Sequence, residues 1–202
     1  MKKINYSGQI KKAILPSTFL SLLMVVLLSI LFVTLSSPRK ENKVEMLIGA
    51  KECDTSRLVD YVSKGKQDYI YQIEASCYES NSNTFLTYYV NTLGSMDITI
   101  IPESIFTIGA FTSNIAKYAE LKLNVINKYM DLSSCSFFEN NGKKYGIKIY
   151  DFESKKGSLI DYIKYEECSY YLFISASSLH GGELNNSVHD GIFDIVKSII
   201  EI

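Results

Sequence analysis

The chain contains no tryptophan, three prolines and two histidines, His180 and His189. The two histidines are nine residues apart across an expected loop–helix junction, which is no recognised metal-ligand spacing. C-x-x-C, G-x-S-x-G, H-E-x-x-H and the phosphate-binding loop are also absent. We therefore predict no metal site, no cofactor and no enzymatic activity. A hydrolase triad assembled in space from a distant Ser or Cys with His180 stays open as an alternative.

The chain also has no excess of basic residues. The formal net charge is −1, but residues 1–39 carry five Lys and Arg and no acid. Residues 40–202 carry 16 Lys and Arg against 22 Asp and Glu, a net charge of −6. No Lys- and Arg-rich patch interleaved with aromatic residues occurs. The composition therefore predicts no nucleic-acid partner.

Charge is absent from one long segment, residues 14–35, which is rich in Leu, Ile, Val and Met. As a helix these residues would span roughly 33 Å, enough for the hydrocarbon core of a bilayer. Pro16 stands near the start, where the first turn of a helix tolerates it. A cleaved signal peptide is the alternative, but its apolar region is usually about 7–15 residues long. We predict an uncleaved transmembrane helix with the lipid bilayer as its partner.

The membrane segment predicts four parts: a cytoplasmic head over 1–13, the helix over 14–35, a linker over 36–43 and an extracytoplasmic domain over 44–202. Large C-terminal domains translocate largely regardless of flanking charge. We therefore expect a single-pass cell-membrane protein with its C-terminal domain outside. No lipobox-like cysteine ends the apolar segment, so the anchor is expected to be helical.

Four cysteines fall in the proposed outer domain, at Cys53, Cys77, Cys135 and Cys168. An even number outside the cytoplasm allows two disulfides in three pairings. The alternative is that the four side chains are small buried hydrophobic groups. The sequence does not distinguish disulfides from buried thiols at these four positions.

Alternating strands and helices are predicted for the first half of the domain. Strands are expected at Val44–Ala50, Tyr69–Tyr78 and Asp97–Ile101, with helices ending at Val62 and Leu93. Such a β-α-β-α-β order calls for parallel strands joined by right-handed crossovers. "ITII" hardly alternates, as expected for a strand covered on both faces. The predicted fold class is α/β, one three-layer domain with a mostly parallel sheet.

The second half of the domain is less regular. Ile105–Met130 is expected to be helical in pieces, and Phe137–Phe152 to form a hairpin around Asn-Asn-Gly. Ser158–Tyr165 is expected to form a short helix, and Tyr170–Ser178 a buried strand. Apolar residues at helical spacing from Val188 onward predict a C-terminal amphipathic helix.

Two stretches carry a family resemblance: the helix leading into "TLGSMDITIIPESIF", and later "YYLFISASSLHGG". With the β-α-β-α-β start they resemble the first lobe of the extracellular solute-binding proteins of bacterial ABC transporters. The resemblance covers Val44–Phe106 and returns at Tyr170–His189. In that family, the loop after the Gly-x-x-Asp strand faces the ligand cleft. The family is about twice this length, and the residues between Phe106 and Tyr170 are too few for a second lobe.

The resemblance implies a single-lobe, membrane-anchored relative of these binding proteins. Its expected function is non-catalytic binding of a small solute, in association with a membrane transporter or another membrane protein. The alternative is a structural or regulatory accessory subunit of a membrane complex that has no small-molecule ligand.

Candidate ligand-binding residues follow from the rule that ligands of open α/β sheets sit outside the carboxyl ends of the strands. The residues that the rule selects are Lys51, Pro102, Glu103, Ser104, Ser178, His180 and Gly181. Glu103 could bind a cation or an amine, and His180 could change charge near neutral pH. The backbone N–H groups at Gly181 could approach a ligand closely. The alternative for each is a solvated loop residue.

Asp97 precedes its strand and is therefore expected at the opposite edge of the sheet from the ligand. We expect its carboxylate to bond the turn that follows Gly94.

Overall fold

The computed structural model describes residues 20–31 and 40–201 of the 202-residue chain. The chain divides into two units, Met1–Pro38 and Arg39–Ile202, which are described separately. In the first unit residues 20–31 form a helix whose apolar side chains are exposed. No helix among the described residues combines the length and the apolar character needed to cross a membrane. The rest of the predicted segment 14–35, and the head 1–13, lie outside the described residues.

The second unit begins with a short 3-10 helix, η1 (Lys40–Asn42), which leads directly into strand β1 (Lys43–Gly49). Regular structure therefore starts inside the predicted linker 36–43, four residues before the expected domain boundary at Val44. Residues 36–39 of that linker lie outside the described residues.

Three parallel strands form the first half of the sheet. β1 pairs in parallel with β3 (Gln72–Tyr78) on one side and with β4 (Ile98–Pro102) on the other. Met46 of β1 stands opposite both Ala75 and Ile98. The predicted parallel arrangement is confirmed for these strands.

Two helices connect the parallel strands, and each begins where the sequence indicates. The Arg57 amide donates to the Asp54 side chain at the start of α2 (Thr55–Val62). The Ser82 hydroxyl likewise accepts from the Phe85 amide at the start of α3 (Asn83–Thr92).

Antiparallel strands form the second half of the sheet. β9 (Tyr170–Ile174) pairs antiparallel with β4, and β6 (Lys143–Asp151) pairs antiparallel with β9. β5 (Phe137–Asn140) and β7 (Lys156–Gly157) both pair with β6, so the sheet order is β3-β1-β4-β9-β6-β5. The sheet is mixed, and the parallel prediction does not extend beyond β4. A strand covered on both faces reads as a continuous apolar run in either direction, so the run of β9 did not reveal its orientation.

A small second sheet lies apart from the main one. β2 (Glu52–Cys53), just after β1, pairs antiparallel with β8 (Ile163–Lys164). The predicted short helix over Ser158–Tyr165 is replaced by turns and this strand.

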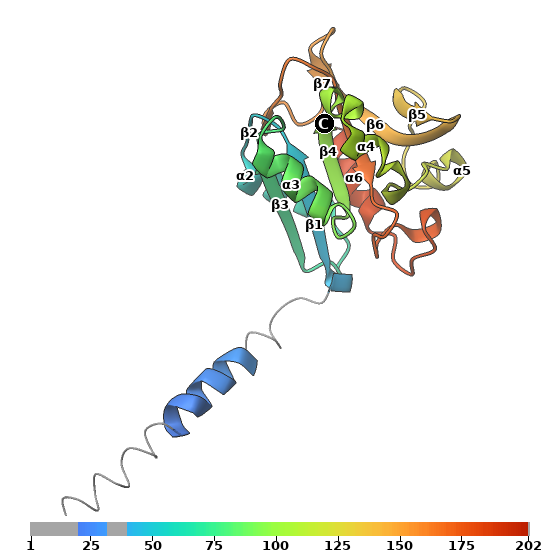
Figure 1. The fold of residues 1–202 in the computed structure, drawn as a ribbon. Helices are drawn as coiled ribbons and strands as arrows, with labels where there is room; N and C mark the ends of the chain where they lie inside the picture. The colour runs from blue at the N-terminus through green and yellow to red at the C-terminus, as the bar shows by residue number, and fades with distance from the viewer. Residues whose placement is uncertain (1–19, 32–39, 202) are drawn as a thin grey trace, which may run out of the picture. The chain divides into compact units, whose positions relative to one another are not determined.

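Helices cover both faces of the main sheet, which makes three layers (Figure 1). α2, α5 (Leu123–Ile126) and α6 (Ile192–Ile200) pack on one face. α3, η3 (Glu103–Thr107) and α4 (Gly109–Thr112) pack on the other. Short 3-10 turns complete the connections, at η2 (Ser63–Gly65), η4 (Ile115–Lys117) and η5 (Gly182–Leu184).

Two local expectations have different outcomes. The β5–β6 hairpin turns at Asn141 and Gly142, which both have positive φ (50° and 74°), as the Asn-Gly signal predicts. α6 starts at Ile192, so Val188 lies before the helix and is exposed instead of facing the core.

One disulfide joins the small sheet to the main one. Cys53 of β2 is bonded to Cys77 of β3, whereas Cys135 and Cys168 are half-buried thiols. The bridge closes a loop that contains all of α2, with a sequence separation of 24.

Removing this bridge is expected to destabilise the domain by about 3 kcal/mol, because the unfolded chain loses the constraint on a loop of that length. The double variant Cys53→Ala/Cys77→Ala should unfold at a lower urea concentration than the wild type. Reductant should lower the urea concentration at the unfolding midpoint of the wild type and of Cys135→Ala, but should leave the midpoint of the double variant unchanged. Equal sensitivity of all three proteins to reductant would contradict the bridge.

Candidate functional site

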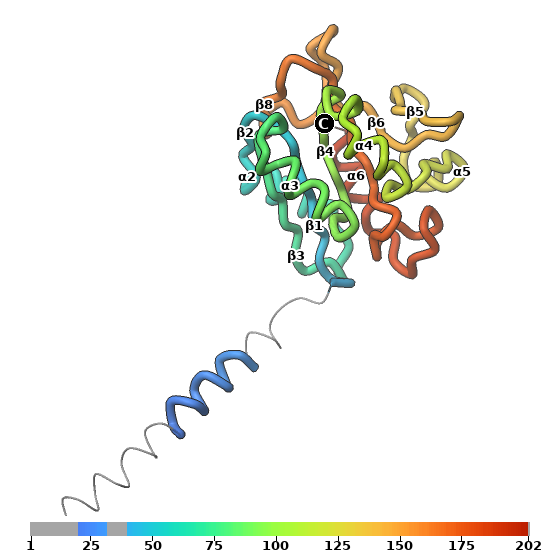
Figure 2. Tube along the Cα trace, viewed as in Figure 1, coloured from blue at the N-terminus to red at the C-terminus, as the bar shows by residue number. Residues whose placement is uncertain are grey.

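The main sheet has two ends with different chemistry. The carboxyl ends of β1, β3, β4 and β6 lie together, next to β2 and β8 at the top of the domain in Figure 2. We call this the carboxyl edge. The amino ends of β1 and β4 lie at the opposite end, the amino edge, where η1 (Lys40–Asn42) begins the domain. Because β9 runs antiparallel to β4, its own carboxyl end is at the amino edge.

A cleft of about 870 Å³ opens at the carboxyl edge. Its walls are β2, the first turn of α2, β8 with the loop before it, and Tyr150 at the end of β6. The residues that give the cleft its chemistry are Asp54, Tyr150, Lys155, Asp161, Tyr162, Lys164 and Tyr165.

Aromatic rings form part of the wall of the cleft. Tyr150 stacks on Tyr165 with ring centroids 4.2 Å apart. The Tyr165 hydroxyl donates to the Ser158 carbonyl at 2.6 Å, and burial raises the pKa of Tyr165 well above its ordinary range. Tyr162 contacts Tyr61 at 5.5 Å between centroids and lies under the Arg57 guanidinium. These contacts fix the orientation of the rings before any ligand binds.

Charges of both signs surround the aromatic wall. Lys164 pairs with Glu52 across the small sheet at 3.3 Å, and Asp54 caps α2. Asp161 is exposed at the rim and makes no ion pair with another described residue. Lys155 also lines the rim. The cleft therefore offers donors, acceptors and both charges to a polar molecule.

Four of the predicted site residues lie at the carboxyl edge but outside the cleft lining. Lys51 is exposed just after β1, and Pro102 is buried opposite Tyr170 in the sheet. Glu103 and Ser104 are exposed at the start of η3. The cleft at the same edge is lined instead by residues 52–56, Tyr150, Lys155 and residues 160–165.

The other three predicted residues, Ser178, His180 and Gly181, lie at the amino edge. They follow β9, whose reversed direction takes them away from Lys51 and Glu103. All three are buried, so they are not the solvated loop residues of the alternative either. The sequence rule failed here because it assumed that β9 is parallel to β4.

Asp97 is the centre of the amino edge. Its carboxylate accepts from the Ser178 hydroxyl at 2.6 Å and from the Glu45 amide at 2.9 Å. Burial raises the pKa of Asp97, although these two hydrogen bonds act in the opposite direction. The expected bond to the turn after Gly94 is not made by Asp97; instead the Ser177 hydroxyl donates to the Gly94 carbonyl at 2.7 Å.

His180 is fully buried, and other groups contact both of its ring nitrogens. Nε2 lies 2.9 Å from the Lys43 carbonyl, which can only accept, so we assign the proton to Nε2. Nδ1 faces the Tyr69 hydroxyl at 3.4 Å, and that hydroxyl accepts from the Gly191 amide at 2.9 Å. The Ser178 hydroxyl donates to Asp97 and not to His180. The arrangement is a polar core contact and not a nucleophile–base pair.

Sequence reasoning missed the cleft residues between Lys155 and Tyr165. The sequence predicts a short helix over Ser158–Tyr165, which would place its Tyr and charged side chains on different faces and not in one wall. The run "DYIKYEE" was the available signal. Among residues 20–31 and 40–201, no group of three His, Cys, Asp or Glu side chains is placed to hold a metal ion.

Comparisons with known proteins are sparse. No family model matches the sequence, and no curated protein matches it. Two crystal structures of the N-glycan transport solute binding protein NgtS from Streptococcus pneumoniae, one in complex with Man1GlcNAc, align with 54% of this chain. The aligned part spans 25% of each NgtS chain, with 15% and 14% identity and TM-scores of 0.35 and 0.37. A likeness this weak carries no argument about function.

The hydrogen bonds that Asp97 makes with Ser178 and Glu45 predict the relative stabilities of two variants. Asp97→Ala leaves the Glu45 amide without its acceptor, at a cost of about 1–3 kcal/mol. Asp97→Asn should cost less, because its amide can accept from Glu45 and donate to Ser178. In urea unfolding near pH 4, the free energy of unfolding should be highest for wild type, lower for Asp97→Asn and lowest for Asp97→Ala.

The raised pKa of Asp97 predicts that the stability of the domain depends on pH. A carboxyl whose pKa is raised by folding contributes stability below its unfolded pKa of about 3.9 and loses it as pH rises through the folded pKa. The stability advantage of wild type over Asp97→Asn should therefore shrink as pH increases above about 4. Asp68→Asn, at an exposed carboxyl, controls for the substitution itself. Parallel pH profiles for wild type and Asp97→Asn would contradict the raised pKa.

Proposed function

We propose that this chain is a membrane-anchored extracytoplasmic binding protein that holds a small polar solute without transforming it. The observation that carries the proposal is the open cleft of about 870 Å³ at the carboxyl edge. Ligands of α/β sheets bind at this edge, and the volume is that of a small-molecule site.

The chemistry of the cleft favours a polar solute with one apolar face, such as a sugar or an amino acid. Tyr150, Tyr162 and Tyr165 provide ring surface, and Asp161, Lys155 and Lys164 provide charge at the rim. Tyrosines combine an apolar body with a polar tip, which suits ligands of mixed polarity.

Binding without catalysis is favoured by the positions of the candidate catalytic groups. Ser178 and His180 are buried at the amino edge, away from the cleft. Their polar atoms bond Asp97, Lys43 and Tyr69, so His180 does not act as a base for the Ser178 hydroxyl.

The anchor and the location rest on the sequence. The uncharged segment 14–35 is long enough to span a bilayer. The Cys53–Cys77 disulfide fits an oxidising compartment outside the cytoplasm. A membrane transporter is the partner that a tethered binding domain would serve.

Ligand binding should raise the melting temperature of residues 40–202, because a ligand stabilises the folded state it binds. A panel of sugars, amino acids and short peptides should contain at least one compound that raises it. The variant Lys155→Ala/Asp161→Ala should lose that rise, since both side chains line the cleft rim. Glu103→Ala, exposed at the same edge but outside the cleft, should keep it.

No shift across the panel, together with purification of the full chain in a complex with other membrane proteins, would favour the accessory-subunit role instead. A shift that Glu103→Ala removes and Lys155→Ala/Asp161→Ala retains would place the ligand outside the cleft.

A further inference from the structure

Exposed apolar side chains gather at the amino edge of the domain. Tyr71 is 72% exposed, Leu179 47% and Val188 93%. These three residues define the amino-edge patch. Elsewhere in residues 40–201 the exposed large apolar side chains are Val90 and Ile160, on α3 and at the cleft rim.

Hydrogen bonds and ring contacts of adjacent residues link the three chain segments that carry these side chains. The Tyr71 amide donates to the Asn42 carbonyl at 2.8 Å, and the Asn42 side chain donates to the Tyr69 carbonyl at 2.8 Å. The Tyr69 ring stacks on His189, next to Val188, with centroids 4.5 Å apart. The same ring contacts His180, next to Leu179, at 5.8 Å.

One side of the patch lies beside the first described element of the second unit. Asn42, which contacts Tyr69 and Tyr71, belongs to η1, the first element of the second unit. Only five residues of sequence separate Lys40 from the end of the uncharged segment at Leu35. A bilayer that held this segment would therefore be linked to η1 by a short piece of chain.

We propose that the amino-edge patch rests on the lipid surface of the membrane that holds the chain. This proposal depends on the proposed function, because it requires segment 14–35 to be the anchor. Tyrosine is enriched at the level of lipid headgroups, where its ring is apolar and its hydroxyl is hydrated. Leu179 and Val188 would enter the apolar side of that layer. The cleft, at the opposite edge of the sheet, would then face away from the bilayer.

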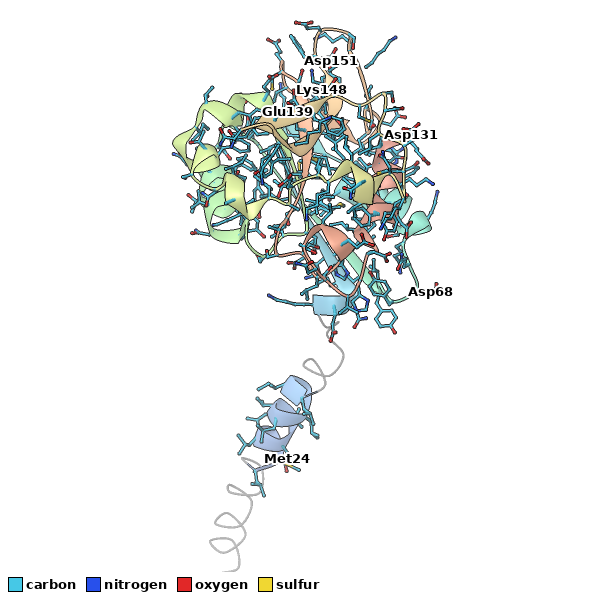
Figure 3. All side chains as sticks on the ribbon, turned by 90° about the vertical axis from the view of Figure 1, so that its right-hand side faces the viewer. Met24, Asp68, Asp131, Glu139, Lys148 and Asp151 are labelled. Atoms are coloured by element: carbon cyan, nitrogen blue, oxygen red, sulfur yellow. A yellow bond between two sulfur atoms is a disulfide. The ribbon has the colours of Figure 1, made fainter. Side chains whose placement is uncertain are left out.

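Charge at this edge is mixed, which favours an apolar contact over attraction to anionic lipid. Asp68 lies at this end of the domain (Figure 3). Lys43 is neutralised by Glu45 at 2.7 Å and Glu74 at 2.8 Å. We therefore expect contact with zwitterionic phosphatidylcholine that 1 M salt does not abolish.

The absence of tryptophan makes a direct experiment available, because any introduced tryptophan is the only one in the chain. Four single variants of the full chain are reconstituted in phosphatidylcholine vesicles with or without brominated acyl chains. Val188→Trp and Leu179→Trp report on the patch. Ile160→Trp, 52% exposed at the cleft rim, is the matched control, and Leu27→Trp reports on the anchor.

The proposal expects brominated lipid to reduce the fluorescence of Val188→Trp, Leu179→Trp and Leu27→Trp, and to leave Ile160→Trp unchanged. Loss of fluorescence for Leu27→Trp alone overturns the lipid contact while the anchor stands. Loss of fluorescence for Ile160→Trp as well would show general adsorption of the domain to the vesicle, and would overturn a specific contact by the amino edge. No loss for Leu27→Trp overturns the anchor, and the lipid contact with it.

Discussion

The Asp97 carboxylate is the contact on which the arrangement of the domain depends. It joins β1, through the Glu45 amide, to the segment after β9, through the Ser178 hydroxyl. The Asp97 backbone continues the connection, because its amide donates to Glu45 and its carbonyl accepts from Ser175. A buried carboxylate is costly unless it is hydrogen-bonded, so the Glu45 amide and the Ser178 hydroxyl must stay beside Asp97. These bonds hold the end of β9 beside the starts of β1 and β4. The direction of β9 then determines which loops reach the carboxyl edge of the sheet.

That direction separates the two ends of the domain. The carboxyl edge receives β2, the start of α2, β8 and the end of β6, which together form the open cleft. The amino edge receives the loop between η2 and β3 and the loop after β9, and there His180 and Tyr69 bond backbone groups of Lys43 and Gly191. One end is therefore hollow, with aromatic and charged side chains in its walls. The other is closed inside and carries apolar side chains on its surface.

The sequence predicted the local elements well, because local signals determine them. Asp54 and Ser82 cap their helices, Asn141-Gly142 turns its hairpin, and the apolar runs become strands. The sequence could place only some of the candidate residues at the correct edge, since the edge depends on strand direction and periodicity does not encode direction. Ser178 and His180 were placed beside Glu103 for that reason. Part of the cleft wall comes from residues 160–165, whose position depends on pairing between β2 and β8, two strands of two residues each.

Amide hydrogen exchange of the full chain, with and without a solute that raises the melting temperature, tests the central claim that the carboxyl edge is the binding end. When the solute is present, amide exchange should slow in residues 51–56 and 160–165 and stay unchanged in residues 177–191. Slower exchange confined to residues 177–191 would contradict it, and would return the ligand site to Ser178 and His180.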